Sequence, residues 1–365
     1  MELYGGKKMN ICVLYGGRSG EHEVSLRSAA SVVKNLDTSR YTIVAIGIDK
    51  AGRWQLQEKP HLVDLPGQGA SLSIVPDSTP VSIRPSDGIH APGGKLAVDC
   101  VFPVLHGSFG EDGTVQGLLE IAGLPYVGAG VPGSAISMDK EAAKRLWRDA
   151  GLPIVSFQAV DRSSTARDIR DAAAAIGMPI FVKPCSAGSS LGVSRVDDEA
   201  GLGAAVAEAL RYDTRALLER CVDAREIECA VIGNARPRAF PPGEIVPSVA
   251  HGFYDYDAKY TDKDGASLET TARIDEEMRA RIMRVAESAY AAVRCEGMAR
   301  VDFFLERGTG ELFLNEINTI PGFTSISMFP RMCEASGLPY PRLLDTLIEM
   351  ALARDAEKKS VRYEK

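Results

Sequence analysis

Strand-like apolar runs that end at glycines and lead into helical segments restrict the fold of this chain more than any other feature. Residues 10–15 (NICVLY) run into two glycines, and apolar and small residues then recur at helical spacing over residues 25–36. Further strands are predicted over residues 42–48 and 96–105, and a helix over residues 114–122. Strands that alternate with helices predict a parallel α/β domain, with sites where strands end in glycine loops.

The rest of the chain predicts two further units of α+β type. A loop over residues 128–137 marks the first boundary, and Ser137 is expected to cap the helix that follows it. The predicted division is into residues 1–137, 138–224 and 225–365. The elements expected in the second and third units are helices over residues 139–150, 166–176, 200–210, 276–294 and 340–352, strands over residues 180–183, 192–196 and 216–219, and a β-hairpin over residues 298–318. The last ten residues are expected to form a solvated tail.

Composition excludes several classes of protein. The chain carries 42 Lys and Arg against 49 Asp and Glu, a net charge of −7, which argues against a surface that neutralises many nucleic-acid phosphates. It has no apolar run long enough to span a membrane and no signal-peptide centre in its first ten residues. Its seven cysteines never form CxxC and are expected to be reduced. We therefore expect a cytoplasmic protein with neither nucleic-acid nor membrane partners.

The predicted hairpin places charged side chains together. A turn at residues 307–310 puts position 302 opposite 316 and position 300 opposite 318, so alternation brings one set of polar residues to one face: Arg300, Asp302, Glu316 and Asn318. An apolar set is expected on the other face: Val301, Phe303, Leu305, Phe313 and Ile317. Two carboxylates and an amide oxygen at cross-strand distance suit Mg²⁺. The alternative is a solvated outer face with a cross-strand Arg–Glu pair.

Two glycine-rich segments are candidate phosphate loops. Lys183 ends a strand and opens the loop KPCSAGSSLG, whose backbone N–H groups and hydroxyls can close over phosphate oxygens; the alternative is a surface turn. The segment GAGVPG at residues 128–133 matches GxGxxG, but Pro132 removes an N–H from such a cradle. We interpret this second segment as a turn between domains.

Three other positions keep two interpretations each. Glu21 follows the first glycine loop and either caps the N-terminus of a helix or projects into a cleft toward a substrate ammonium. His106 ends a strand and is either a capping histidine or a site residue. Lys259 and Tyr260 lie in an aromatic, acidic stretch that forms either a lid or a loop packed down by its own tyrosines.

Seven motifs in order resemble those of the D-alanine–D-alanine ligases of the ATP-grasp superfamily. The resemblance covers residues 10–352 and rests on GGRSGEHEVS, LHGSFGEDGTVQG, SMDKEAAK, FVKPCSAGSSLGV, FYDYDAKY, MARVDFF and LNEINTIPGFTSISMFP. It implies an ATP-grasp fold behind an N-terminal Rossmann-like α/β domain. It also implies ATP-dependent joining of two D-alanine molecules through an acyl phosphate, for the bacterial cell wall.

The resemblance implies roles for individual residues. Asp302, Glu316 and Asn318 would hold two Mg²⁺ ions, for which Mn²⁺ is a possible substitute. The residues implied to contact ATP are Lys140, Lys183, Ser190, Glu219, Glu226 and Lys259. Glu21 would bind the first substrate's ammonium beside His106, while Arg300 and the Gly322 N–H would stabilise oxyanion charge. The second substrate would meet Ser327, Met328 and Lys259, and Glu21, Ser189 and Tyr260 would link the lid to the N-terminal domain.

Alternatives to this activity stay open. A relative that accepts D-lactate or D-serine at the second position is expected to differ mainly at the lid. A nucleotide sensor built on an inactive ligase fold is expected to lack a metal ligand or Arg300, and this chain has all of them. The chain departs from the family pattern at Ala224 and Thr271, where glycine and proline are common. The family is commonly dimeric, so we expect a homodimer.

Overall fold

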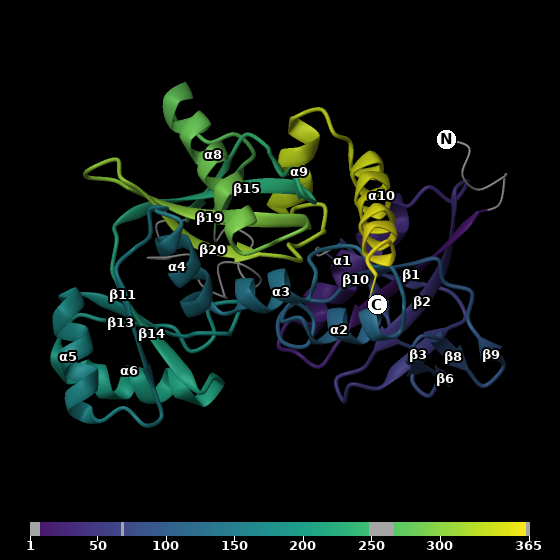
Figure 1. Ribbon diagram of the computed structural model, residues 1–365, viewed down its shortest axis with the longest axis horizontal. Coiled ribbons are helices and arrows are strands. Elements are labelled where there is room, and N and C mark those ends of the chain that lie inside the picture. Colours follow the sequence, from purple (N-terminus) through teal and green to yellow (C-terminus); the bar gives the residue numbers. More distant parts are fainter. Residues whose placement is uncertain (1–7, 67–68, 248–265, 363–365) are drawn as a thin grey trace.

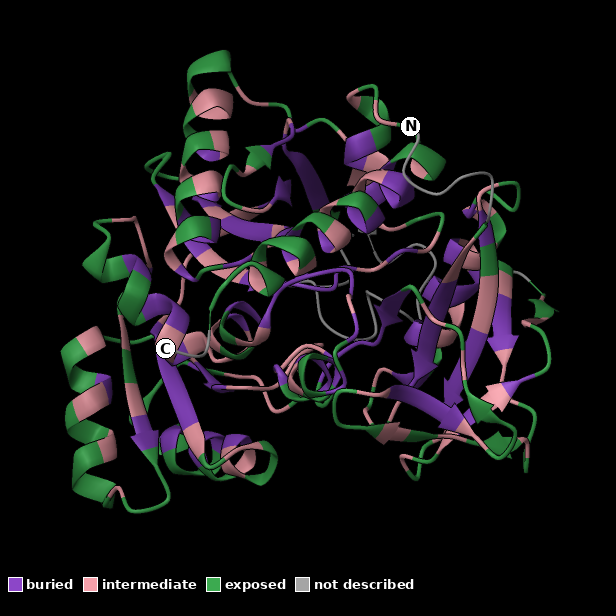
Figure 2. Ribbon diagram, turned by 45° about the vertical axis from the view of Figure 1, so that its right-hand side comes forward, coloured by how far each residue is buried: buried purple, intermediate pink, exposed green. Residues whose placement is uncertain are grey.

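The computed structural model describes residues 8–66, 69–247 and 266–362. Three main sheets form its framework (Figure 1), with the N-terminal sheet on one side, a small four-stranded sheet on the other and the C-terminal sheet between them. Buried residues follow the strands, and exposed residues lie on the outer sides of the helices (Figure 2). The candidate site residues come from all three of these parts.

The N-terminal sheet has the strand order β10-β1-β2-β3-β6. Strand β1 (Met9–Gly16) pairs in parallel with β2 (Tyr41–Ile48) and β10 (Cys100–Val104), which confirms the predicted parallel sheet. Two antiparallel strands extend its edge: β3 (Trp54–Gln57) and β6 (Thr79–Pro80). Its other elements are the helices α1 (His22–Asn35) and α2 (Thr114–Ile121), the hairpin β4–β5 (His61–Leu65, Gly69–Ser73) and the small sheet β7–β9 (Ser82–Arg84, Gly88–Ala91, Gly94–Lys95).

The last helix of the chain completes the N-terminal core. Helix α10 (Tyr340–Lys359) lies beside α1 and the N-terminal sheet (Figure 1), and Leu343, Leu347 and Ile348 share one apolar core with Ile11 of β1. The helix continues past the predicted end at residue 352, so residues 356–359 are helical, although most of them are solvent-exposed as predicted. Ion pairs stabilise this last turn, because Lys358 binds Glu120 and Lys359 binds Asp355.

The predicted loop at residues 128–137 is in part a helix, α3 (Val131–Met138). Pro132 is compatible with it because a proline in the first turn costs no helical hydrogen bond. The cap of α4 (Lys140–Asp149) also differs from the prediction, since the Asp139 carboxylate accepts a hydrogen bond from the Ala142 N–H at 3.0 Å and Ser137 does not cap this helix.

The four-stranded sheet is antiparallel, with the order β11-β14-β12-β13. Two helices cover it with a small apolar core. The elements are β11 (Phe157–Asp161), α5 (Ala166–Ile176), β12 (Ile180–Pro184), β13 (Ser194–Val196), α6 (Glu199–Tyr212) and β14 (Arg215–Arg220). Strand β12 ends where the predicted phosphate loop begins.

The C-terminal sheet has the order β18-β17-β15-β19-β20, with β16 beside β15. Its elements are β15 (Ala224–Gly233), β16 (Arg238–Ala239), β17 (Gly243–Pro247), β18 (Ala266–Glu269), α8 (Glu276–Ala292), β19 (Gly297–Glu306), β20 (Leu312–Asn318) and an unpredicted helix, α9 (Met328–Ala335). Helix α4 packs against α8 through Trp147, whose Nε1–H donates to the Ala289 carbonyl at 3.0 Å, and Trp147 shares one apolar core with residues of this sheet. Since α4 also contacts the four-stranded sheet, it lies at the seam between the two.

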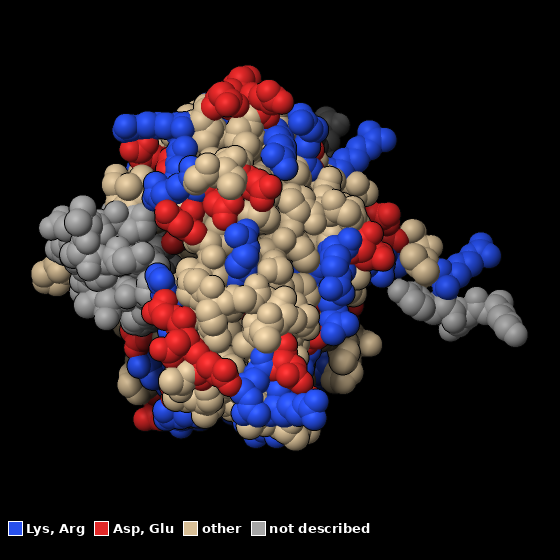
Figure 3. Space-filling model, turned by 90° about the vertical axis from the view of Figure 1, so that its left-hand side faces the viewer, with Lys and Arg blue, Asp and Glu red and all other residues tan. Residues whose placement is uncertain are grey.

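Charges of both signs are interspersed on the end of the molecule that carries α5 and α6 (Figure 3). Arg167 pairs with Asp171 within α5, and Arg170 pairs with Glu199 of α6. Among the residues that the structure describes, no helix combines the length and apolarity that crossing a membrane requires.

Candidate active site

The hairpin β19–β20 has the predicted pairing at its polar end. Arg300 lies opposite Asn318 and Asp302 opposite Glu316. Toward the turn the register shifts after Asp302, and the extra residue on β20 is Asn315. Phe313 therefore changes face.

The prediction that Phe313 lies on the apolar face was wrong because of this bulge. Its ring lies under the guanidinium of Arg220, 5.2 Å from ring centroid to Cζ, while Leu312 and Leu314 are buried in the core instead. Val301, Phe303, Leu305 and Ile317 lie in this core as predicted.

The polar face of the hairpin is a network of opposite charges. Arg300 donates from Nε and Nη2 to the two oxygens of Asp302, at 2.7 and 2.6 Å, and its Nε lies 3.1 Å from Glu228 Oε1. Asn318 Nδ2 donates to Asp302 at 2.9 Å. Burial disfavours the charged guanidinium, but Asp302 and then Glu228 outweigh this effect and raise the pKa of Arg300. Arg300 is therefore a fixed cation.

The donors on this face fit a divalent cation. Asp302, Glu316 and Asn318 project from adjacent strands and offer two carboxylates and an amide oxygen, the hard ligands that Mg²⁺ prefers. They belong to two strands at the edge of the C-terminal sheet whose other face is packed in the core. The alternative of a solvated outer face is not supported, because Asp302 is 9% exposed.

Lys140 joins this face to the glycine-rich loop. It is the first residue of α4, and its Nζ lies 3.5 Å from Glu316 Oε2 and donates to the Ala187 carbonyl at 2.8 Å. Its backbone N–H donates to the Cys185 carbonyl at 2.9 Å. One residue thus touches the metal-ligand face and the candidate phosphate loop.

Two lysines share one buried carboxylate behind that loop. Lys183 Nζ and Lys144 Nζ each lie 2.5 Å from an oxygen of Glu219, which is 2% exposed. Burial favours the neutral acid, but the charges of Lys144 and then Lys183 outweigh it and lower the pKa of Glu219. Sequence reasoning missed Lys144, although it is the last residue of the SMDKEAAK motif and lies one helical turn after Lys140.

Glu226 lies on β15 in register with Phe304. It shares a sheet face with Glu228, two residues further along the strand. Sequence reasoning also missed Glu228, although the REIE run predicts both glutamates on one face of a strand. Glu226 therefore borders the face of Arg300 and Asp302.

The glycine-rich loop reaches the N-terminal domain. Ser189 and Ser190 have positive φ angles of 52° and 57°, which turn the chain back on itself. The Ser189 hydroxyl donates a hydrogen bond to Glu21 Oε1, and a side-chain carbon at Gly188 would lie only 3.2 Å from the same carboxylate. Glu21 precedes α1 and makes no side-chain cap of that helix. Glu21 holds the N-cap position of α1 through its backbone carbonyl, so the capping interpretation is wrong only for its side chain.

His106 lies beside Glu21 in a buried polar cluster. Its Nε2 is 3.0 Å from the Ser28 hydroxyl, and its Nδ1 is 3.0 Å from the Ile320 carbonyl and 3.6 Å from Glu111. Burial alone would lower the pKa of His106, but Glu111 and then Glu21 outweigh it and raise this pKa. Glu111 was missed by sequence reasoning.

The segment before α9 contributes a tight turn. A side-chain carbon at Gly322 would lie 2.7 Å from the Ser327 hydroxyl, which accepts a hydrogen bond from the Thr324 N–H at 3.0 Å. Met328 is buried in the apolar core with Phe329 and Met332. The predicted lid residues Lys259 and Tyr260 lie outside the described residues.

Comparison with known proteins identifies the family. The sequence matches two protein-family models, described as D-ala D-ala ligase N-terminus over residues 10–129 and D-ala D-ala ligase C-terminus over residues 146–349. The chain belongs to the D-alanine–D-alanine ligase family. The ATP-grasp fold expected from the resemblance is thereby confirmed.

Relatives of this ligase family match over nearly the whole chain. The D-alanine–D-alanine ligase of Solibacter usitatus is 49% identical, over 98% of this chain and 99% of its own, and D-alanine–D-alanine ligase A of Bradyrhizobium diazoefficiens is 46% identical, over 97% and 98%. The structure of the D-alanine–D-alanine ligase from Coxiella burnetii has a TM-score of 0.84 at 40% identity, over 96% of both chains. The VanG D-Ala:D-Ser ligase of Enterococcus faecalis has a TM-score of 0.82 at 35% identity, over 94% of this chain and 100% of its own.

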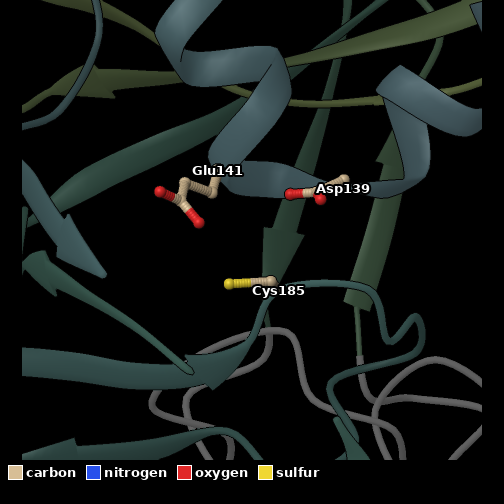
Figure 4. A group of neighbouring side chains, drawn as sticks. All are labelled: Asp139, Glu141 and Cys185. Atoms are coloured by element: carbon tan, nitrogen blue, oxygen red, sulfur yellow. The ribbon is translucent and has the colours of Figure 1, made fainter. Parts of the chain in front are cut away.

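A second cluster of potential metal ligands lies at the start of α4 in this ligase. Ligand atoms of Asp139, Glu141 and Cys185 lie within 4.8 Å of one another (Figure 4). The Arg215 guanidinium already binds both carboxylates, Glu141 at 2.5 Å and Asp139 through its other nitrogen, and Arg145 also pairs with Glu141 at 2.7 Å. Burial raises the pKa of Cys185 to about 12, so its thiol stays protonated. We therefore interpret this cluster as a structural contact that joins the start of α4 to β14 beside the end of β12.

Proposed function

We propose that the protein joins two D-alanine molecules into D-alanyl-D-alanine at the expense of ATP, through a D-alanyl phosphate intermediate, for peptidoglycan synthesis. The observation that carries the proposal is the polar face of β19–β20, where Arg300 and the oxygen donors Asp302, Glu316 and Asn318 meet beside Lys140. The full-length match to named ligases supplies the substrate.

Activation by ATP is required because a free carboxylate does not react with an amine. A carboxylate oxygen of the first D-alanine attacks the γ-phosphorus, the bond to ADP breaks, and a mixed anhydride forms. The deprotonated amine of the second D-alanine then attacks the carbonyl carbon, and inorganic phosphate leaves. Negative charge develops at both steps on oxygens that the site must stabilise.

The residues of this chain divide the substrate contacts among them. Glu21, whose carboxylate does not cap α1, binds the ammonium of the first D-alanine, with His106 beside it. Arg300 and the backbone N–H of Gly322 stabilise oxyanion charge on the acyl phosphate and the tetrahedral intermediate. Ser327, with Lys259, engages the carboxylate of the second substrate, and Met328 supports that turn from the core.

The nucleotide lies between the two sheets that α4 joins. Lys140, Lys183 and the loop hydroxyl of Ser190 contact its phosphates, while Glu219 and Glu226 contact the adenine and ribose. Asp302, Glu316 and Asn318 would hold two Mg²⁺ ions, replaceable by Mn²⁺, which would supply charge neutralisation at the phosphates. Ser189 links the loop to Glu21, and Tyr260 extends this link to the lid.

Further assignments are part of the same proposal. The units are residues 1–137 for the first substrate, residues 138–224 for the phosphate loop and residues 225–365 for the lid and metal ligands. The protein acts as a homodimer in the cytoplasm. The apolar core shared by α10 and the N-terminal sheet supports an arrangement in which the first and third units pack firmly together.

The second candidate is a ligase that uses D-serine, since VanG, named a D-Ala:D-Ser ligase, matches at 35% identity. The test is phosphate release from ATP and Mg²⁺ with D-alanine, L-alanine, D-serine or D-lactate offered alone, and with D-alanine combined with D-serine or D-lactate. We expect D-alanine alone to support release and to yield the dipeptide. Release only with D-alanine plus D-serine would support the second candidate, and release that depends on L-alanine would overturn both.

A further inference from the structure

The seam between the four-stranded and C-terminal sheets contains a lysine with no solvent access. Lys144 lies on α4, and its side chain is 0% exposed. Its Nζ lies 2.5 Å from Glu219 Oε1 on β14 and 3.5 Å from the Leu314 carbonyl on β20. Lys144 therefore contacts strands of both sheets at once.

Lys144 and Lys140 form a pair one turn apart on α4. Lys140 reaches Glu316 and the glycine-rich loop, whereas Lys144 reaches Glu219 and the strand that carries Glu316. Only Lys140 is partly open to solvent, with 12% of its side chain exposed. Lys144 cannot reach a ligand unless the two sheets separate, so it can influence the site only through the residues that it contacts.

Glu219 has two cationic partners of different accessibility. Lys183 also lies 2.5 Å from Glu219, but 10% of its side chain is exposed and it opens the phosphate loop. A buried carboxylate that loses its sole cationic partner pays a large desolvation penalty. With Lys144 in place, Glu219 keeps a partner when Lys183 turns to a phosphate.

We propose that Lys144 is a positioning residue, a buried counter-ion of Glu219 that frees Lys183 to bind nucleotide phosphate. In its absence, Glu219 would hold Lys183, and the phosphates would lose most of that lysine's contribution. The inference rests on the proposed nucleotide site, in which Lys183 contacts phosphate.

The test compares the affinities for adenosine and for adenylyl imidodiphosphate with Mg²⁺, measured by calorimetry without D-alanine. The dissociation constant for adenosine divided by that for the triphosphate analogue isolates the contribution of the phosphates, and a smaller ratio means a smaller contribution. We expect Lys144→Met to reduce this ratio by about tenfold or more, because Lys183 stays with Glu219. Arg148→Met, which removes an exposed cation from the same helix, is the matched control and should leave the ratio unchanged.

A second substitution separates this role from a purely structural one. Adding Glu219→Gln to Lys144→Met removes the charge that holds Lys183, so the ratio should recover toward the wild-type value even if adenosine binding weakens. Lys144→Gln replaces Lys144→Met in both measurements if the latter does not fold. An unchanged ratio in the single variant, or a further fall in the double variant, would overturn the inference. Wild-type protein that binds adenosine and the triphosphate analogue equally would instead overturn the proposed nucleotide site.

Discussion

Ser189 donates a hydrogen bond to Glu21, a residue 168 positions earlier in the chain. The donor belongs to the glycine-rich loop after β12, and the acceptor lies at the start of α1. This contact joins the proposed phosphate loop to the proposed site of the first amino acid. The carboxylate is therefore held by a residue of the proposed phosphate loop.

Glu21→Gln is expected to weaken binding of the first D-alanine. Removing one partner of a partly buried ion pair typically costs about 2–5 kcal/mol, so the KM for D-alanine should rise strongly. Affinity for nucleotide without D-alanine should stay close to wild type. Glu23→Gln, which alters an exposed carboxylate paired with Lys50, is the control. Loss of nucleotide affinity with an unchanged D-alanine KM would contradict the assignment.

Glu316→Gln should abolish turnover while the protein remains folded. The substitution removes one charge from the metal-ligand face, and metal stabilisation of phosphoryl charge is worth several kcal/mol. Turnover is measured against Mg²⁺ concentration, with thermal unfolding as the check on folding. Glu311→Gln, at the exposed turn of the same hairpin, should behave as wild type. A wild-type kcat at saturating Mg²⁺ would return this face to a structural role.

Arg215→Met should destabilise the start of α4. The guanidinium is 38% exposed and bonds both Asp139 and Glu141, so its loss should reduce the free energy of unfolding by about 1–3 kcal/mol. Because Asp139 caps the helix that begins at Lys140, the KM for ATP should rise as well. Denaturant unfolding and initial rates measure the two effects. Arg211→Met removes an exposed arginine paired with Glu208 and should change neither.

His106 should make stability depend on pH. The pKa of His106 is raised in the folded protein relative to the unfolded chain, where it is about 6.5. Protonated His106 therefore stabilises the fold fully at pH values below about 6.5, and this stabilisation is lost as the pH rises through the pKa of His106 in the folded protein. The Tm difference between wild type and His106→Gln should therefore shrink with increasing pH above about 6.5. A difference that is constant from pH 5 to 9 would show that His106 contributes only neutral hydrogen bonds.

The regular elements and the hairpin pairing could be predicted because they depend on local patterns. Continuous apolar runs that end at glycines identified the parallel strands, and the turn at residues 307–310 fixed the pairing of Asp302 with Glu316. The bulge at Asn315 could not be predicted, since nothing in the strand pattern marks one extra residue. Phe313 was therefore assigned to the wrong face.

Residues that act through distant partners were missed for a different reason. Lys144 meets Glu219 across 75 positions, and Glu228 meets Arg300 only because β15 and β19 are neighbours. Burial then decides the chemistry of such groups, and burial depends on the assembled sheets. Periodicity alone identifies a helix or strand but not what packs against it.

The position of α10 imposes an order on the biosynthesis of this protein. Ile11 and Val13 of the first strand share a core with Leu343, Leu347 and Ile348, which are translated last. The part of this apolar face that α1 does not cover therefore stays exposed on the ribosome until nearly the entire polypeptide has been made, and the nascent chain can aggregate during that time. A chain released at residue 339 should accordingly be cleaved by protease within its N-terminal sheet, where the full-length protein is protected; equal protection of both would contradict this order.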